Sequence, residues 1–230
     1  EVPISPSFMK KLQKKGIGIQ VVTDKEAIKL PADAIDSEII NSAEEVKIIK
    51  EYVESADEEK IKENLVAKDN DLTPIGKVYN FEVSVVDKEG NDKKVDRFNS
   101  KAKVEIQMDS DDLDSIKDKR KAGIYYVAKD GATEFKGGKF SDTGIEFETD
   151  HFSSYVVMEY NKTFQDTKEN WAEEYIEVLA ARHITEGVDE NNFNTTGKVT
   201  RAQFATFLGR ALGIEEAAYD DTFSDVSNDA

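Results

Sequence analysis

Cysteine is absent from this sequence of 230 residues, and histidine occurs only twice, at His151 and His183. The absence of cysteine excludes disulfides, a thiolate nucleophile and zinc sites built on cysteine ligands. Two histidines are too few for a zinc site with three histidine ligands. We therefore expect both histidines to be surface or packing residues, and we expect no cofactor.

Long apolar runs are also missing. No segment approaches the roughly 20 consecutive apolar residues that a helix needs to cross a bilayer, so we expect no membrane insertion. The chain begins at Glu1 and shows no basic segment followed by an apolar leader. This beginning leads us to expect an excerpt of a longer or processed protein.

Positive charge is scarce, since Lys and Arg number 31 against 48 Asp and Glu, giving a formal net charge of −17. A protein that binds nucleic acid usually carries a basic face and a high pI, whereas the pI here is about 4.6. We expect neither nucleic acid nor an anionic membrane surface as a partner. Hydrophobic residues make up 38% of the chain, which is enough for a core.

The first part of the chain mixes short segments of different periodicity. Phe8, Met9 and Leu12 share one face at helical spacing. The expected elements are a helix over 6–12 capped by Ser7, strands over 16–22 and 27–30, and a polar helix or loop over 56–67. The short apolar run at 46–53 fits a strand or a helix, and we favour the strand.

From residue 78 onward the apolar residues alternate with polar ones at a period of two. The expected strands are 78–86, 102–108, 124–127, 145–149 and 154–160, with turns at 87–91 and 129–131. Short strands at this spacing are typical of an antiparallel sandwich. We expect a β-sandwich module over residues 1–160, with a division into subdomains 1–75 and 76–160 as an alternative.

The acidic stretch 109–114 invites a test for calcium, which prefers several oxygen ligands at alternating positions. The EF-hand pattern fails, because Asp114 stands where glycine is required and Arg120 where glutamate is required. A solvated acidic loop is the favoured interpretation, and calcium stays a weaker alternative.

The pattern becomes helical after residue 160. Residues 169–182 form an amphipathic helix pattern, with a stripe of Trp171, Tyr175, Ile176, Leu179 and Ala180. A polar loop follows over 187–198. A second helix opens at Thr200, which forms a capping box with Gln203, and has a stripe of Ala205, Leu208 and Leu212 before a stop at Gly213. The fold class is therefore α+β and multidomain, an antiparallel β-sandwich module followed by an all-α helix-loop-helix unit.

One short pattern occurs twice. Phe164-Gln165-Asp166 and Phe223-Ser224-Asp225 are both F-x-D and lie 59 residues apart. A unit of this length that stops within its second copy suggests a tandem array. We assign the first repeat to residues 161–214, and a linker with the truncated start of a second repeat to residues 215–230.

Residues 163–214 resemble an S-layer homology repeat. The blocks that carry the resemblance are Phe164 with Asp166, Trp171-Ala172, Ile176, Leu179, Ile184 with Gly187, Phe193, and Val199-Thr200-Arg201-Ala202-Gln203. The sequence departs from the family pattern at His183, where glycine is usual, and at Thr195, where proline is usual. Residues 149–157 resemble the last strand of β-modules that lie upstream of such arrays.

The resemblance implies an exported protein anchored non-covalently to the bacterial cell envelope. The implied partner in Gram-positive bacteria is a secondary cell wall polysaccharide with acidic, often pyruvylated, sugars. Further S-layer homology repeats of the same chain are also implied partners, because three repeats usually combine with pockets between neighbours. The implied location is that of a secreted protein on the bacterial cell surface, in the cell wall or S-layer. The β-module would then be a spacer.

Five residues are candidates for contact with a sugar. Arg201 is the strongest, because a guanidinium can meet a carboxylate with two parallel hydrogen bonds and the helix N-terminus adds free N–H groups; a plain surface arginine, or a bridge to Asp166, is the alternative. Trp171 could stack on a sugar or pack in the core. Asp166 and Gly187 could contact ligand or only shape turns, and Gln203 could offer its amide or only cap the helix.

Two other functions stay open. The β-module could assemble laterally as a structural S-layer or surface lattice, with calcium as a conceivable cofactor. Alternatively, the chain could be the non-catalytic tail of a secreted polysaccharide-degrading enzyme. No catalytic motif is present, and no pair of carboxylates is singled out among the 48 acids, so we expect no enzyme active site in these residues.

Overall fold

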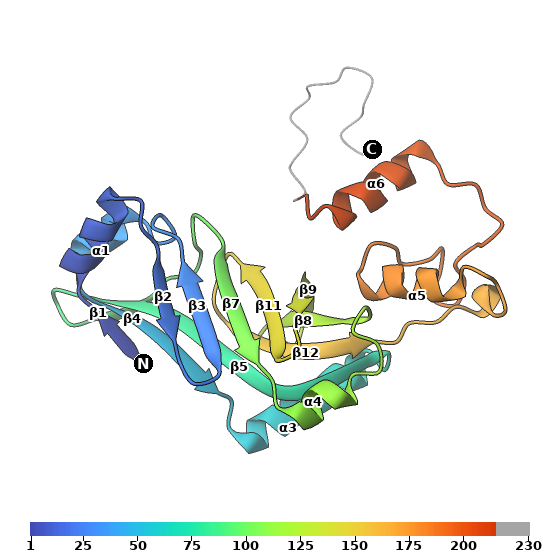
Figure 1. Ribbon diagram of the computed structural model, residues 1–230, viewed down its shortest axis with the longest axis horizontal. Coiled ribbons are helices and arrows are strands. Elements are labelled where there is room, and N and C mark those ends of the chain that lie inside the picture. The colour runs from blue at the N-terminus through green and yellow to red at the C-terminus, as the bar shows by residue number, and fades with distance from the viewer. Residues whose placement is uncertain (215–230) are drawn as a thin grey trace. The chain divides into compact units, whose positions relative to one another are not determined.

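The computed structural model describes residues 1–214 and divides the chain into two compact units, Glu1–Lys162 and a second unit that begins at Thr163 (Figure 1). The expected linker and second repeat start over 215–230 lie outside the described residues. No helix among residues 1–214 is both long enough and apolar enough to span a bilayer.

The first unit consists of two antiparallel β-sheets, as the alternating pattern predicted. One sheet has the order β1 (Val2–Ile4), β4 (Ala43–Tyr52), β5 (Leu72–Asp87), β12 (Ser154–Tyr160), β8 (Ala122–Val127) and β9 (Thr133–Gly137), and β6 (Asp92–Lys94) pairs with β5. The other has the order β10 (Lys139–Phe140), β11 (Gly144–Thr149), β7 (Ala102–Gln107), β3 (Glu26–Leu30) and β2 (Ile19–Val22).

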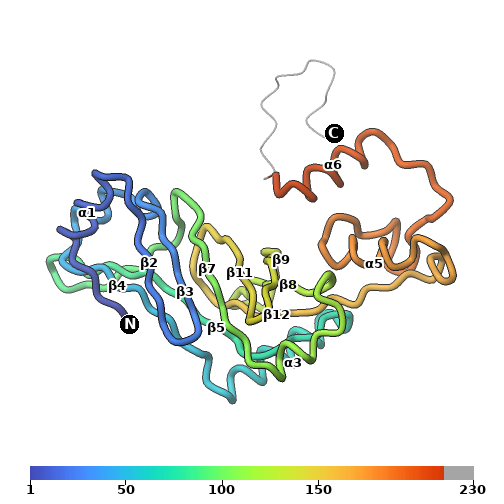
Figure 2. Tube along the Cα trace, viewed as in Figure 1, coloured from blue at the N-terminus to red at the C-terminus, as the bar shows by residue number. Residues whose placement is uncertain are grey.

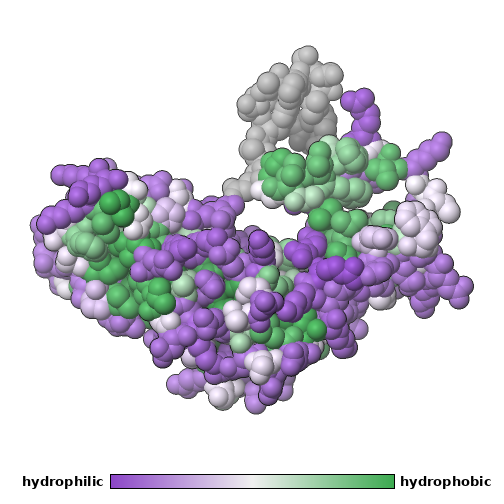
Figure 3. Space-filling model, in the orientation of Figure 1, coloured by the Kyte–Doolittle hydropathy of each residue, from purple (hydrophilic) through white to green (hydrophobic). Residues whose placement is uncertain are grey.

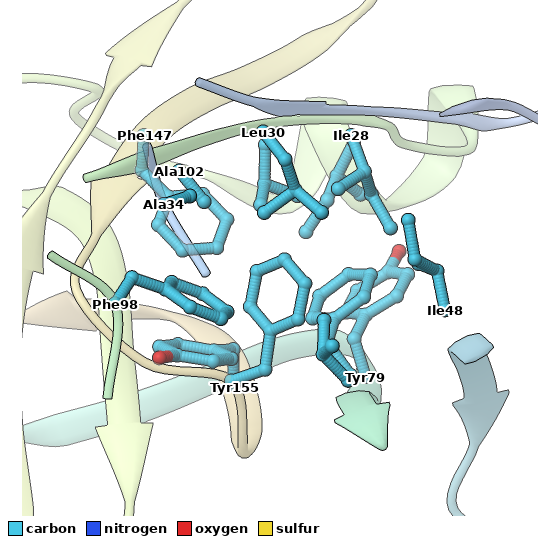
Figure 4. Packing of buried hydrophobic residues seen from close by; sticks show 14 of the residues in the cluster. Ile28, Leu30, Ala34, Ile48, Tyr79, Phe98, Ala102, Phe147 and Tyr155 are labelled. Atoms are coloured by element: carbon cyan, nitrogen blue, oxygen red, sulfur yellow. The ribbon is translucent and has the colours of Figure 1, made fainter. Parts of the chain in front are cut away.

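The two sheets face each other across one apolar core. Alternate residues of β7 point into it, so that Ala102, Val104 and Ile106 are all buried. Figure 4 shows side chains from both sheets in this core. They are Ile28, Leu30, Ala102 and Phe147 from one sheet, and Ile48, Tyr79 and Tyr155 from the other.

Four helices accompany the sheets: α1 (Pro6–Lys14), α2 (Ser37–Ser42), α3 (Ser55–Lys68) and α4 (Ser110–Ser115). The segment left open as a helix or loop is the helix α3. Its Leu65 is buried in a second apolar cluster with Val156 and Met158 of β12. Strand β12 is therefore apolar on both faces, which explains its nearly continuous run of hydrophobic residues.

Some expectations for this unit are wrong. Helix α1 is capped by Ser5 rather than Ser7, since the Ser5 Oγ accepts the Phe8 N–H. The Phe8 side chain is 51% exposed and does not share the buried face of Met9. The subdivision at 75/76 does not fit, because β5 runs through this point and each sheet contains strands from both halves.

The expected acidic loop at 109–114 is also wrong, since Ser110–Ser115 form helix α4. Asp109 precedes this helix, and its carboxylate pairs with the Lys25 ammonium at 2.6 Å. Among residues 1–214 no three histidine or acidic side chains are grouped so that they could hold a metal ion.

The second unit is helical. It contains a 3₁₀ turn, η1 (Gln165–Thr167), then α5 (Glu173–Ala181) and α6 (Arg201–Ala211), with a long loop between the last two (Figure 2). The expected stripe of α5 is only partly buried, because Ile176 and Ala180 are buried whereas Tyr175 and Leu179 are 63% and 40% exposed. The expected stripe of α6 is exposed as well, including Leu208 and Leu212.

Candidate functional site

The first turn of α6 is held by the capping box that the sequence predicted. The Thr200 hydroxyl accepts the Gln203 N–H at 3.2 Å, and the Gln203 side-chain oxygen accepts the Thr200 N–H at 3.0 Å. Each of the two side chains thus accepts the backbone N–H of the other residue, as a capping box requires. The side-chain oxygen of Gln203 is thus already bonded to the Thr200 N–H. A contact between the side-chain NH₂ of Gln203 and a sugar stays a prediction.

Arg201 is the first residue of α6, and its side chain is exposed. It forms no ion pair with any residue in the described range 1–214, and the alternative of a bridge to Asp166 is not realised. Its guanidinium is therefore available to an external anion. The N-terminal end of a helix also favours negative charge through its backbone N–H groups and dipole.

The Asp166 carboxylate organises the loop that precedes α6. One oxygen, Oδ1, accepts the N–H of Phe193 at 2.8 Å, and the other, Oδ2, accepts those of Asn194 at 2.7 Å and Thr195 at 3.2 Å. These backbone hydrogen bonds, with that from Phe193 the strongest, lower the pKa of Asp166. The geometry fits the alternative in which Asp166 shapes a turn.

Thr195 stands where the resemblance leads one to expect proline. Its N–H donates to Asp166, which a proline could not do because it has no backbone N–H. Its hydroxyl also donates to the Asp166 carbonyl at 3.4 Å. The departure from the family pattern therefore adds contacts to the same loop.

Gly187 has a positive φ of 81°, as expected for a turn. A Cβ at this position would lie 2.6 Å from the Phe164 ring and 2.7 Å from the Asn192 carbonyl oxygen. Phe164 is buried, and its ring lies 5.6 Å from that of Phe193. Gly187 is thus required by both backbone conformation and close packing on Phe164, which explains its place in the motif without a ligand.

His183 follows α5 in a left-handed conformation, with φ of 53°. Its N–H donates to the Ala180 carbonyl at 2.9 Å, and the next N–H, of Ile184, donates to that of Leu179 at 3.0 Å. This pair of bonds is a Schellman motif, in which glycine is the usual residue at the position of His183. The departure at His183 therefore places a bulkier residue in the conformation that glycine adopts best.

Trp171 lies just before α5, and its side chain is 86% exposed. The buried cluster of this unit consists of Phe164, Ile176 and Ala180, with Ala172 and Phe193 packed against it. Trp171 is not part of this cluster in the described residues, so its indole face is open to solvent and suited to stacking on a sugar.

The five candidates do not form one described pocket. Asp166 and Gly187 both lie around the Phe164–Phe193 pair, and Arg201 and Gln203 share the first turn of α6. Asp189, which is not among the predicted residues, also shapes this loop, since its Oδ1 accepts the N–H groups of Asn191 at 2.8 Å and Asn192 at 2.9 Å. The signal was the aspartate two positions before Asn191 and three before Asn192, a spacing typical of an Asx turn. These hydrogen bonds lower the pKa of Asp189.

Comparison with protein families agrees with the position of the helical unit. Residues 163–205 match the family described as the S-layer homology domain. This range includes Asp166, Trp171, Gly187, Arg201 and Gln203.

Similar curated proteins are named as enzymes. The chain is 41% identical over 119 residues to an amylopullulanase of Thermoanaerobacterium thermosulfurigenes and 46% identical over 72 residues to the exoglucanase XynX of Acetivibrio thermocellus. It is also 46% identical over 66 residues to the endo-1,4-β-xylanase A of Thermoanaerobacterium saccharolyticum. The matches cover 50%, 31% and 29% of this chain, but only 6%, 7% and 6% of the relatives.

Four observations fall on the segment 163–205. They are the block pattern of the sequence, the capped start of helix α6, the loop held by Asp166 and the family match. Such a domain implies anchoring at the cell envelope. Residues 163–205 of this chain are therefore an S-layer homology domain, and a β-rich module of two antiparallel sheets precedes it.

Proposed function

We propose that this chain anchors an exported protein to a Gram-positive cell wall by binding the acidic sugars of a secondary cell wall polysaccharide, with the β-module as spacer. The observation that supports this most is the state of Arg201. Its guanidinium is exposed at the start of a capped helix and is not paired within residues 1–214. A pyruvyl ketal or a uronate offers a carboxylate that matches the guanidinium in geometry and charge.

Net charge makes this local cation important. With a formal charge of −17, the chain as a whole repels an acidic polymer at long range. Recognition must then depend on short-range donors, namely guanidinium and backbone N–H groups at a helix N-terminus. Trp171 adds an exposed ring that can cover the apolar face of a sugar.

The test is co-sedimentation of the chain with purified Gram-positive cell walls, and with the same walls stripped of their secondary polysaccharide. We expect binding only to the intact walls. Arg201→Glu should lower the affinity by about tenfold or more, because it replaces an attraction with a repulsion at short range.

Lys198→Glu is the matched control, since it makes the same change of charge three residues away on an exposed side chain. We expect a change of about twofold or less. Equal binding to stripped walls would overturn the proposal, and equal losses for both variants would overturn the role of Arg201.

The relatives support a further part of this proposal, namely that the chain is a non-catalytic region of a secreted polysaccharide-degrading enzyme. Each relative is named as an enzyme, and the chain corresponds to 7% or less of its length. We expect the purified chain to release no reducing sugar from starch or xylan above background. Release that survives purification would contradict this assignment.

A further inference from the structure

The start of the chain has the opposite charge character from the rest. Residues 2–23 contain four lysines and no acidic residue, in a chain whose formal net charge is −17. The four are Lys10, Lys11, Lys14 and Lys15. A local concentration of one charge sign against the overall balance is a physical basis for binding an oppositely charged partner.

The structure places these lysines along one side of α1 and at its C-terminal end. Residues 10 and 14, and residues 11 and 15, are each four apart and hence neighbours on the helix surface. Lys11, Lys14 and Lys15 are exposed and Lys10 is half-buried, while Pro6 and Met9 hold the opposite side against the module. In Figure 3, α1 lies at the upper left, where purple hydrophilic side chains stand beside green hydrophobic ones.

None of the four ammonium groups forms an ion pair within the part of the chain that the structure describes, although other lysines of the β-module do, such as Lys25, Lys50 and Lys103. Like charges four apart on a helix repel each other. Lysines in the last turn do favour the helix dipole, but that effect is local to the turn and does not account for Lys10. An anionic partner would relieve the repulsion of the whole group.

A hollow of about 590 Å³ adjoins the C-terminal end of α1. Its lining includes Gln13 of α1, Asp33, Asp36 and Asn99. Amide and carboxylate side chains are donors and acceptors suited to sugar hydroxyls. The described lining contains no lysine, and the carboxylates of Asp33 and Asp36 repel acidic groups. The hollow therefore suits only the neutral, hydroxyl-bearing part of a ligand whose acidic groups contact the lysines of α1.

An acidic polysaccharide fits this surface better than an anionic membrane. Helix α1 has nine residues, and its apolar Pro6 and Met9 are buried in the module. Phe8, which is 51% exposed, is thus the one large apolar side chain that α1 presents to solvent. A single ring offers little apolar area for insertion among lipids.

We propose that the basic face of α1, formed by Lys10, Lys11, Lys14 and Lys15, together with the adjoining hollow, is a second binding site for acidic polysaccharide in the β-module. The β-module is then a wall-contacting part of the chain rather than only a spacer. The choice of a polysaccharide over other polyanions rests on the function proposed for the S-layer homology domain. Two weak sites on one chain would increase its residence on the wall through effective concentration.

The test is binding of the whole chain to polygalacturonate, a polymer of uronic acids, with dextran as the neutral control polymer. The quadruple variant Lys10→Gln, Lys11→Gln, Lys14→Gln and Lys15→Gln should lose about tenfold in affinity, and the loss should shrink at high salt because the contacts are screened. The matched arginine variant of the same four positions should retain binding.

A control variant removes four exposed lysines elsewhere in the module, namely Lys88→Gln, Lys93→Gln, Lys129→Gln and Lys139→Gln, and has the same net charge. It should change the affinity by about twofold or less. Equal losses of affinity in the α1 variant and in this control variant would overturn the site, because they would show that only the net charge of the chain matters. Binding of the unaltered chain to phosphatidylglycerol vesicles but not to polygalacturonate would overturn the choice of ligand.

Arg201→Glu separates this site from the S-layer homology domain. A loss of polygalacturonate binding in the lysine variant but not in Arg201→Glu supports the α1 site and counts against the function proposed for Arg201. A loss in Arg201→Glu alone supports that function and overturns the α1 site. Circular dichroism of each variant checks that the fold is retained.

Discussion

The Oδ1 atom of Asp166 accepts the backbone N–H of Phe193 at 2.8 Å, across 27 residues of sequence. This bond joins the turn before α5 to the loop before α6. The two other N–H groups bound to the same carboxylate belong to Asn194 and Thr195. One side chain therefore fixes the backbone that leads into the helix whose first residue is Arg201.

Replacing Asp166 by asparagine should loosen this loop. One oxygen would remain as an acceptor, but an amide NH₂ would then face N–H groups and could not accept their hydrogen bonds. We expect a lower melting temperature for the helical unit and faster amide exchange at residues 193–195. Glu190→Gln, at an exposed acid of the same loop, is the matched control and should leave both measurements unchanged. Equal exchange rates in Asp166→Asn and the unaltered chain would contradict the structural role.

The β-module should lose stability in acid through Asp150. Burial raises the pKa of its carboxyl, but hydrogen bonds from His151 and Arg97 outweigh burial and bring the pKa to about 2. Because the folded pKa lies below the unfolded value of about 3.9, this stabilisation is fully present above pH 4 and disappears as the pH falls towards 2. The Arg97 side chain is 76% exposed, so solvent screens this interaction and we expect a net contribution of about 1 kcal/mol.

Urea unfolding of the chain between pH 2 and pH 6 measures this effect. Asp150→Asn should be less stable than the unaltered chain at pH 6, and the difference between them should shrink towards pH 2. An unchanged difference over this range would show that Asp150 does not titrate with a lowered pKa.

Local sequence patterns predicted most helices and strands, because in these segments the tertiary structure favours the same conformation as the local pattern. The alternation in 102–108 became β7, and the capping box at Thr200 and Gln203 became the start of α6. Elements without such a pattern were missed, including β1 and β6, each of three residues. Strands this short form because a longer neighbour, β4 or β5, supplies their partners, and this information is not local in sequence.

Burial was harder to predict than secondary structure. The sequence places Ile176 and Tyr175 on one amphipathic stripe of α5, yet Ile176 is buried and Tyr175 is 63% exposed. Sequence spacing shows which residues share a face, but not how much of that face a neighbouring element covers. For Gly187 the sequence leaves contact with a ligand and a turn equally open, and its close packing on Phe164 depends on tertiary structure.

Gly187→Ala should destabilise the helical unit by about 2 kcal/mol or more, because it combines a left-handed backbone with a Cβ 2.6 Å from the Phe164 ring. Gly209→Ala is the control. Gly209 lies inside α6, and a Cβ there would meet no atom of the described residues within 4 Å. That variant should instead stabilise by about 0.5–1 kcal/mol through helix propensity. Thermal unfolding followed by circular dichroism measures both, and equal effects would contradict the packing argument.

His183→Gly should stabilise the same unit. His183 and Gly213 both follow a helix in a left-handed conformation, with φ of 53° and 64°, and both belong to the same pattern of two C-terminal hydrogen bonds. A residue other than glycine is strained there, so we expect a gain of about 0.5–1 kcal/mol for His183→Gly. Gly213→Ala, the reverse change at the equivalent position, should cost a similar amount. Thermal unfolding should show a higher melting temperature for His183→Gly and a lower one for Gly213→Ala. A lower melting temperature in His183→Gly would contradict the expectation.

Trp171 and Phe164 should separate ligand binding from folding. Trp171 is 86% exposed and lies outside the buried cluster, so Trp171→Ala should change the stability of the unit by less than about 0.5 kcal/mol. If its indole stacks on a sugar, the affinity for intact cell walls should fall by roughly threefold to tenfold. Phe164→Ala should instead destabilise the unit by about 3 kcal/mol or more, because it removes a buried ring. Any loss of wall binding in that variant would follow from unfolding. Trp171→Phe keeps an aromatic face and should retain most of the affinity. A Trp171→Ala variant that unfolds more easily than the unaltered chain would assign this residue to the core, and one that binds walls with full affinity would remove it from the site.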